Sequence, residues 1–159
     1  MASPKHVLFV CTGNTCRSPM AECLFRKFVE EREDFIVGSA GLSACKGDMA
    51  NSHTLKILKR RGIHPAGFSS RPVTTGLLSQ ATHVFAMTRA HLDLLEEGFP
   101  EFAGKYFLVR EFAGVPETNE SKDIPDPIGM GPAAYDEVAS ILESAIPRIV
   151  SYIESTETP

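Results

Sequence analysis

The sequence lacks the features of membrane proteins and of proteins that bind nucleic acid. No apolar run approaches the roughly 18 residues that a membrane-spanning helix needs, and the run at residues 6–10 is too short for the core of a signal peptide. Basic residues form no extended run, and 16 Lys and Arg against 20 Asp and Glu give a formal charge of -4. We therefore expect a cytoplasmic protein with no membrane segment and no nucleic-acid partner.

The chain also lacks the marks of a disulfide-stabilised or metal-binding protein. Its 159 residues, 43% of them hydrophobic, are enough to bury a core without covalent cross-links, so the four cysteines are considered one by one. The five histidines do not show the spacing of metal ligands, and no repeat, low-complexity tract or linker interrupts the chain. These absences predict one domain over residues 1–159 that uses no metal and no cofactor. The oligomeric state stays open.

What the sequence does contain is a regular alternation of strand and helix patterns. The apolar run 6–10 is typical of a strand buried on both faces of a parallel sheet, and a helical pattern starts at Pro19. Further strands are expected at 35–37, 81–87 and 105–109, and further helices at 54–61, 89–97 and 135–153. This alternation predicts an α/β fold, a single-domain four-stranded parallel sheet with helices on both faces. Pro147 should kink or split the last helix.

The loop after the first strand carries a nucleophile in a setting that suits an oxyanion. Residues 11–19 read CTGNTCRSP. Gly13 and Asn14 favour positive φ, which turns successive backbone N–H groups inward, and the helix that follows adds its positive dipole end. Arg17 can grip two oxygens of a tetrahedral oxyanion at once. In this field Cys11 should exist as the thiolate, which is the competent nucleophile.

These residues resemble the signature of the low-molecular-weight protein tyrosine phosphatases. The similarity covers VLFVCTGNTCRSPMAE at residues 7–22 and continues through GSAG at 38–41 and the pair Asp126-Pro127, so it spans nearly the whole chain. The resemblance implies a protein phosphatase that works in two steps on a phosphorylated protein. Cys11 would attack phosphorus while Arg17 and the loop amides hold the oxygens, and water would then cleave the cysteinyl-phosphate.

The resemblance also implies roles for the remaining loop residues. The residues expected to bind the substrate phosphate are Thr12, Gly13, Asn14, Thr15, Cys16 and Ser18. Ser18 would stabilise the Cys11 thiolate, and Ser39 would hold Asn14 in a strained conformation. The family further supports a reversible disulfide between Cys11 and Cys16 that protects the nucleophile, with an inert Cys16 thiol packed beneath the loop as the alternative.

The general acid is expected in the long segment 111–132, which is rich in proline and glycine. The family places its acid in an Asp-Pro pair near the C-terminal end, which indicates Asp126, whereas we interpret Asp123 as a solvated turn residue. One carboxyl can protonate the leaving group and then deprotonate water. The family often has aromatic residues after the pair, and because Ile128 stands there, strong stacking on a substrate ring is not expected.

The phosphorylated residue that is attacked stays open between phosphoarginine and phosphotyrosine. Many tyrosine-directed members of the family have isoleucine before the second cysteine of the loop, whereas a bacterial branch that acts on phosphoarginine has threonine. Thr15 stands at this position and favours phosphoarginine.

Two other functions use a similar loop. Thioredoxin-coupled arsenate reductases need two further thiols in the later third of the chain, and no cysteine follows Cys45. A non-catalytic phosphate-binding module would need neither a cysteine nucleophile nor an Asp-Pro acid. Both alternatives are therefore disfavoured.

Overall fold

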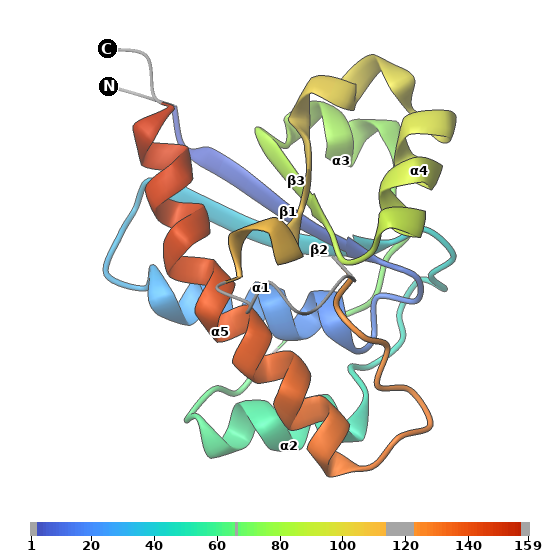
Figure 1. Cartoon of the computed structure of the whole chain (residues 1–159), viewed down its shortest axis with the longest axis vertical. Coiled ribbons are helices and arrows are strands. Elements are labelled where there is room, and N and C mark those ends of the chain that lie inside the picture. The colour runs from blue at the N-terminus through green and yellow to red at the C-terminus, as the bar shows by residue number, and fades with distance from the viewer. Residues whose placement is uncertain (1–2, 66, 114–122, 157–159) are drawn as a thin grey trace.

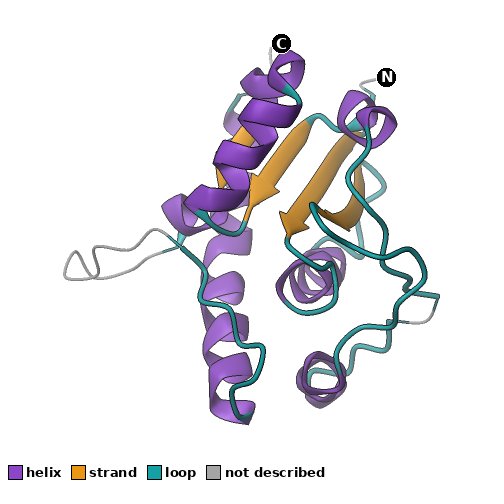
Figure 2. Cartoon of the chain, turned by 90° about the vertical axis from the view of Figure 1, so that its right-hand side faces the viewer, coloured by secondary structure: helices purple, strands orange, loops and turns teal. Residues whose placement is uncertain are grey.

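The computed structural model describes residues 3–65, 67–113 and 123–156 (Figure 1). Its centre is one sheet of four parallel strands in the order β2-β1-β3-β4. The strands are β1 (Lys5–Cys11), β2 (Phe35–Gly41), β3 (His83–Ala86) and β4 (Tyr106–Leu108). The expected four-stranded parallel sheet is therefore confirmed, and its strands run in the same direction (Figure 2).

Helices cover both faces of this sheet. They are α1 (Arg17–Phe28), α2 (Ser52–Arg60), α3 (Thr75–Gln80), α4 (Arg89–Gly98), α5 (Pro132–Ser155) and the 3-10 helices η1 (Pro100–Lys105) and η2 (Val109–Phe112). The helices α1, α2 and α5 lie on one side of the sheet, and α3 and α4 lie on the other (Figure 1). None of the helices in the described residues combines the length and the hydropathy needed to cross a bilayer.

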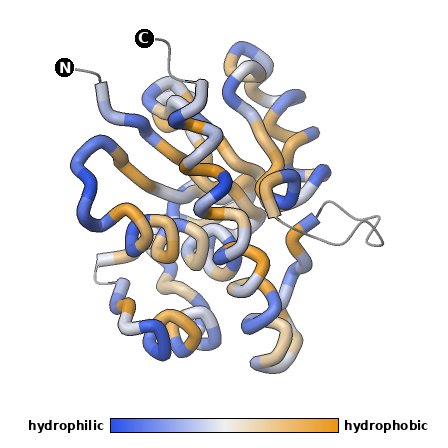
Figure 3. The backbone as a smooth tube through the Cα atoms, turned by 60° about the vertical axis from the view of Figure 1, so that its left-hand side comes forward, coloured by the Kyte–Doolittle hydropathy of each residue, from blue (hydrophilic) through white to orange (hydrophobic). Residues whose placement is uncertain are grey.

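The central strand β1 shows why the sheet is buried on both faces. Successive side chains of a strand point to opposite faces. Val7 and Phe9 belong to the core shared with α1 and α5, and Leu8 and Val10 belong to the core shared with α3 and α4. In Figure 3 the apolar segments run through the interior of the molecule, and many of the outer turns are hydrophilic. Packing on both sides holds the C-terminal end of β1, where Cys11 lies, in a fixed place.

Three local expectations differ from the structure. β2 continues to Gly41 instead of ending at residue 37, because its last residues pair with β1 up to Cys11. The helix α3 was not expected, since it is only six residues long and its clearest signal is the Thr74 side chain that caps it. The splitting of the last helix at Pro147 is wrong, because α5 runs unbroken through it and buries an apolar stripe along its length. Tertiary packing outweighs the local preference in each case.

Candidate active site

The phosphate-binding loop, residues 11–18, connects β1 to the first turn of α1 at the carboxyl edge of the sheet. Asn14 has φ 57°, and no other non-glycine residue in the described ranges has positive φ. Gly13 was expected to share this conformation and does not, so Asn14 alone makes the left-handed turn. Such a conformation is costly for a residue with a side chain, and Asn tolerates it better than most because it can form local hydrogen bonds.

Hydrogen bonds to its side chain hold Asn14 in this conformation. Its Nδ2 donates to Ser18 Oγ at 2.9 Å and to Ser39 Oγ at 2.9 Å, while its Oδ1 accepts from the backbone N–H of Arg71 at 3.0 Å. Asn14 is fully buried. A buried amide whose donors and acceptor are bonded on three sides is stable against rotation, so the surroundings over-determine the strained turn.

The network extends beyond the loop to a glutamate that sequence reasoning did not single out. Ser39 Oγ donates to Glu22 Oε1 at 2.8 Å, and Glu22 Oε2 lies 3.2 Å from Arg26 Nη2. Glu22 is 8% exposed, which is unusual for a carboxylate without such partners. Glu22 ends the family-like stretch at residues 7–22 and stands one helical turn before Arg26. This position was the sequence signal that could have identified it.

The Cys11 sulfur accepts hydrogen bonds from two directions. Ser18 Oγ lies 2.8 Å from Cys11 Sγ, and the backbone N–H of Asn14 donates to the sulfur at 3.3 Å. Because Ser18 Oγ already accepts from Asn14, its own hydrogen is free to point at the sulfur. The Cys11 sulfur thus lies within reach of two hydrogen-bond donors, close to the N-terminus of α1.

The loop backbone is bonded to the segment that follows β2. Backbone N–H groups of the segment 42–51 donate to the carbonyls of Cys11, Thr12 and Thr15 at 2.9, 2.9 and 2.7 Å. This close approach requires a glycine, because a Cβ at Gly41 would lie 2.6 Å from the Thr12 carbonyl oxygen. These bonds tie the loop backbone to the neighbouring segment at three points.

Arg17 joins the loop to the segment that carries the expected acid. Its guanidinium is 5% exposed, donates from Nη1 to the Ile124 carbonyl at 3.0 Å, and lies with Nη2 3.6 Å from Asp126 Oδ2. Both terminal nitrogens of the arginine thus contact the acid segment, residues 123–130, and the same group stands at the end of the phosphate-binding loop. The structure therefore brings Cys11, Arg17 and Asp126 to one edge of the sheet.

Within the acid segment, the two aspartates have different surroundings. Asp126 is half exposed, and its Oδ1 accepts only the backbone N–H of Ile128, at 3.1 Å, among the bonds of the described residues. The reading of Asp123 as a solvated turn residue is wrong, because its Oδ1 accepts the backbone N–H of Arg89 at 2.7 Å, at the start of α4. Asp123 thus anchors the segment to the start of α4, and Asp126 is the more exposed of the two carboxylates.

The second cysteine of the loop, Cys16, is buried. Cys16 is 3% exposed, and its sulfur lies 3.7 Å from the Tyr135 hydroxyl and 3.9 Å from Thr15 Oγ1. Burial raises the pKa of the Cys16 thiol, and desolvation raises the pKa of Tyr135 to about 12. Cys11 and Cys16 are both free thiols here, and a disulfide between them stays a prediction.

The structure adds two residues that no sequence motif indicated. The Arg71 backbone bonds Asn14, and the ring of His91, on α4, lies with Nε2 2.8 Å from Thr12 Oγ1. Both come from segments far away in the sequence. In the described ranges, no group of three or more His, Cys, Asp or Glu side chains could hold a metal ion.

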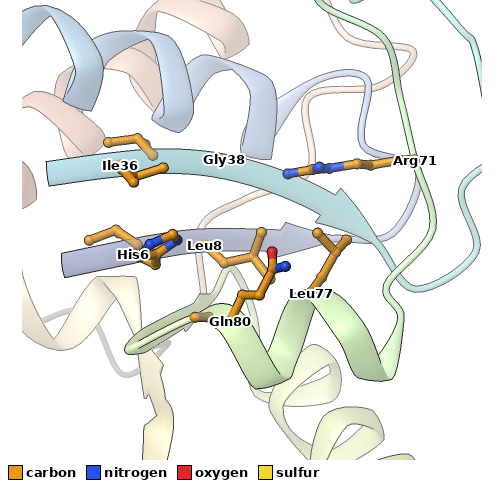
Figure 4. A pocket seen from close by; sticks show the side chains of 10 residues that line it. His6, Leu8, Ile36, Gly38, Arg71, Leu77 and Gln80 are labelled. Atoms are coloured by element: carbon orange, nitrogen blue, oxygen red, sulfur yellow. The ribbon is translucent and has the colours of Figure 1, made fainter. Parts of the chain in front are cut away.

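A cavity of about 190 Å³ elsewhere on the molecule is not part of this site. It lies over β1 and β2 beside α3, and Figure 4 shows the Arg71 side chain reaching along β2 toward Gly38. A Cβ at Gly38 would lie 2.6 Å from Arg71 Nη2, so the glycine makes room for the guanidinium. None of the residues that line this cavity belongs to the phosphate-binding loop or to the acid segment.

Comparisons with known proteins agree on one family. A family model described as low molecular weight phosphotyrosine protein phosphatase matches residues 6–157. The protein-arginine-phosphatase of Geobacillus stearothermophilus is 37% identical over 154 residues, which cover 97% of this chain and 99% of that protein. The low molecular weight protein-tyrosine-phosphatase Ptp of Acinetobacter johnsonii is 30% identical over 142 residues, which cover 89% of this chain and 93% of that protein.

Solved structures show the same relationship. The YwlE arginine phosphatase from Geobacillus stearothermophilus superimposes with a TM-score of 0.84 at 37% identity, covering 96% of this chain and 94% of that one. A YwlE arginine phosphatase mutant with a phosphorylated active-site serine gives a TM-score of 0.83 at 32% identity and covers 96% of this chain and 97% of that one.

Proposed function

Since the chain belongs to the low molecular weight phosphotyrosine protein phosphatase family, and is a phosphohydrolase of that type, we propose that Cys11, Arg17 and Asp126 carry its reaction on phosphorylated proteins. The observation that carries the proposal is their arrangement. The Cys11 sulfur lies 2.8 Å from Ser18 Oγ, and Arg17 at the other end of the same loop lies 3.6 Å from Asp126. This arrangement supports Cys11 as the nucleophile, Arg17 as the group that holds the phosphate oxygens, and Asp126 as the acid.

In the first step, the Cys11 thiolate attacks phosphorus and forms a sulfur–phosphorus bond. The loop amides and the Arg17 guanidinium hold the equatorial oxygens, whose charge spreads in the transition state. The bond from phosphorus to the leaving nitrogen or oxygen breaks, and the Asp126 carboxyl donates its proton to that atom. The product of this step is a cysteinyl-phosphate, together with the dephosphorylated side chain.

In the second step, the now ionised Asp126 takes a proton from water, and the resulting hydroxide attacks phosphorus. The sulfur leaves as a thiolate, which is a good leaving group while Ser18 Oγ and the Asn14 amide donate to it. Inorganic phosphate and the starting enzyme are regenerated. The half-exposed position of Asp126 gives water access to this carboxylate.

We infer that phosphoarginine is the preferred substrate over phosphotyrosine. Thr15 is half-buried in the loop, and it carries a hydroxyl and a smaller volume at the position where many tyrosine-directed members have isoleucine. The exposed residues after the acid are Ile128 and Met130, each 59% exposed, so no aromatic ring from this segment stacks on a tyrosine. Relatives named protein-arginine-phosphatase support the same choice.

The cytoplasm is the compartment we assign to this activity. The chemistry requires a reduced nucleophile, and the four cysteines are all free thiols. Reducing conditions of this kind are found in the cytosol, whereas secreted proteins with four cysteines usually pair them. The assignment would fail if the active protein were recovered from a secreted fraction.

The substrate is tested by phosphate release from matched phosphoarginine and phosphotyrosine peptides, with Cys11→Ser as the blank. We expect faster release from phosphoarginine, and Thr15→Ile should lower that rate selectively. An acid quench of the wild-type reaction should trap a phosphate adduct on Cys11 in a mass spectrum. A preference for phosphotyrosine would overturn the substrate choice, and full activity of Cys11→Ser would overturn the mechanism.

A further inference from the structure

The start of α4 contacts both halves of the proposed catalytic site. On one side, the His91 ring bonds Thr12, the residue after the nucleophile, with 2.8 Å between Nε2 and Oγ1. On the other side, the backbone N–H of Arg89 donates to Asp123 at 2.7 Å. The phosphate-binding loop and the acid segment are thus tied to the same helical turn.

His91 makes few other polar contacts. It is 5% exposed, and its backbone N–H donates to the side chain of Thr88, which caps α4. Its Nδ1 is buried and has no hydrogen-bond partner among the described residues. The ring therefore has one polar attachment in the described structure, and that attachment is to the phosphate-binding loop.

Burial and a neighbouring cation keep the ring neutral. Burial lowers the pKa of His91 to about 4, and the Arg17 cation on α1 acts in the same direction, whereas Asp123 and Asp126 of the acid segment oppose it. A neutral imidazole can exchange a hydrogen bond with a hydroxyl without placing a second positive charge beside Arg17. The arginine is then left as the cation available to the phosphate.

Thr12 is held from two sides by this arrangement. Its carbonyl accepts the backbone N–H of Ser43 at 2.9 Å, and its side chain meets His91. The residue is otherwise exposed, so these two hydrogen bonds are its attachments among the described residues. A shift of Thr12 would move the adjacent Cys11 and change the direction of the loop amides.

We propose that His91 is a positioning residue, whose ring holds Thr12 so that the phosphate-binding loop keeps its shape and its place beside the acid segment. The proposal rests on the proposed function and adds to it a residue that never touches substrate. It differs from the plain alternative, a histidine that merely fills a core, because a core filler would act on stability and leave phosphate binding per folded molecule unchanged.

The decisive comparison is between His91→Gln and His91→Asn. The glutamine amide nitrogen reaches about as far along the side chain as Nε2, so it can still donate to Thr12, whereas the asparagine amide reaches only as far as Nδ1. Both variants are uncharged and polar, and both remove the titrating ring. They differ in whether the bond to Thr12 survives.

Inorganic phosphate is the probe, titrated by calorimetry, together with kcat/KM for an activated aryl phosphate. We expect His91→Gln to stay within about twofold of the wild type, and His91→Asn to weaken phosphate binding and lower kcat/KM by about three- to tenfold. The loss should not depend on the leaving group. In a Thr12→Val background, His91→Asn should add no further loss. The melting temperature of each variant identifies any that fails to fold.

Equal phosphate affinity for the Gln and Asn variants, or an additive loss in the Thr12→Val background, would overturn the positioning role. The test does not depend on turnover, because phosphate binding can be measured on an inactive protein. If the wild type binds phosphate but hydrolyses no phosphopeptide, the proposed function fails while the role of His91 is still decided.

Discussion

The phosphate-binding loop and the acid segment belong to one proposed site and are built in opposite ways. In the loop, Arg17 is 5% exposed, whereas in the acid segment Asp126 is 50% exposed. The Asn14 side chain by itself makes three hydrogen bonds that fix it in place. The Asp126 carboxylate has the Ile128 amide and the Arg17 contact.

The difference follows from what each part must do. In the proposed reaction the loop has to stabilise a thiolate and a charged transition state, so its donors must already be oriented when the substrate arrives. The acid has to give a proton to a leaving group and then take one from water, so it needs access to both. A buried, fully bonded Asp126 would hold its proton or its charge too firmly to perform both steps.

The largest effect is expected in the loop, from Cys11→Ser. The serine hydroxyl is a far weaker nucleophile than a thiolate, so turnover should fall by a factor on the order of 10⁴ or more. Because the amides and Arg17 are untouched, inorganic phosphate should still bind. Single-turnover phosphate release and calorimetry measure the two properties. Turnover near the wild-type level would remove Cys11 from the mechanism.

The next largest effect is expected in the acid segment, from Asp126→Asn. It should lower kcat/KM for substrates with poor leaving groups by a factor on the order of 10² to 10³. The loss for activated aryl phosphates should be far smaller, because their leaving groups need no proton from an acid. The melting temperature should barely change, since the side chain is half exposed. An equal loss on both substrate classes would make Asp126 a structural residue.

The sequence predicts the loop better than it predicts the contacts that hold the loop in place. The loop chemistry is contiguous, so Cys11, Arg17 and the strand–helix context could be predicted together. The bond between His91 and Thr12 joins residues 79 positions apart, and no local pattern marks it. Only the pairing of strands and helices in three dimensions brings such groups together.

The resemblance supplied one of the observed contacts, whereas our interpretation of single residues missed Glu22 and misjudged Asp123. Asn14 and Ser39 were expected to meet and lie 2.9 Å apart. Glu22, the next member of that chain of bonds, was missed because its burial depends on packing between α1 and β2. Asp123 was misread because a turn aspartate near a proline has no sequence sign of the helix start that it bonds.

The stability of the protein should depend on pH through His91, the residue that borders both regions. The folded-state pKa of His91, about 4, lies below the usual 6.5, so the unfolded chain binds a proton more readily as pH falls. The contribution of the neutral His91 ring to the free energy of unfolding is complete above about pH 6.5, and it is lost as pH falls toward 4. Each tenfold change in an ionisation constant is worth about 1.4 kcal/mol, so the wild type should lose about 3 kcal/mol more than His91→Gln between pH 7 and 4.

Urea unfolding of both proteins across this pH range measures the difference, and the other titrating groups cancel because they are common to both. A wild type and a His91→Gln variant that lose unfolding free energy in parallel would mean that the ring is charged, or accessible to water, in the folded protein.

The smallest effect is expected from Ser39→Ala, which changes a residue of β2 that bonds the loop residue Asn14. This change removes the hydroxyl that accepts from Asn14 and donates to Glu22, and it leaves a buried carboxylate oxygen short of one donor. Asn14 keeps its bonds to Ser18 and Arg71, so the strained turn should persist with reduced rigidity. Phosphate affinity should fall by about five- to tenfold, which corresponds to the loss of one or two buried hydrogen bonds.

The matched control is Ser69→Ala, which removes an exposed hydroxyl beside the same strand edge and should change nothing. If the loop is rigid because its supports act together, Ser39→Ala should also weaken the response to a second loop change, so that its combination with Asn14→Ala costs less than the sum of the two. Additive losses would mean that Ser39 stabilises β2 alone, and that the rigidity of the loop comes from the backbone bonds of Cys11, Thr12 and Thr15 instead.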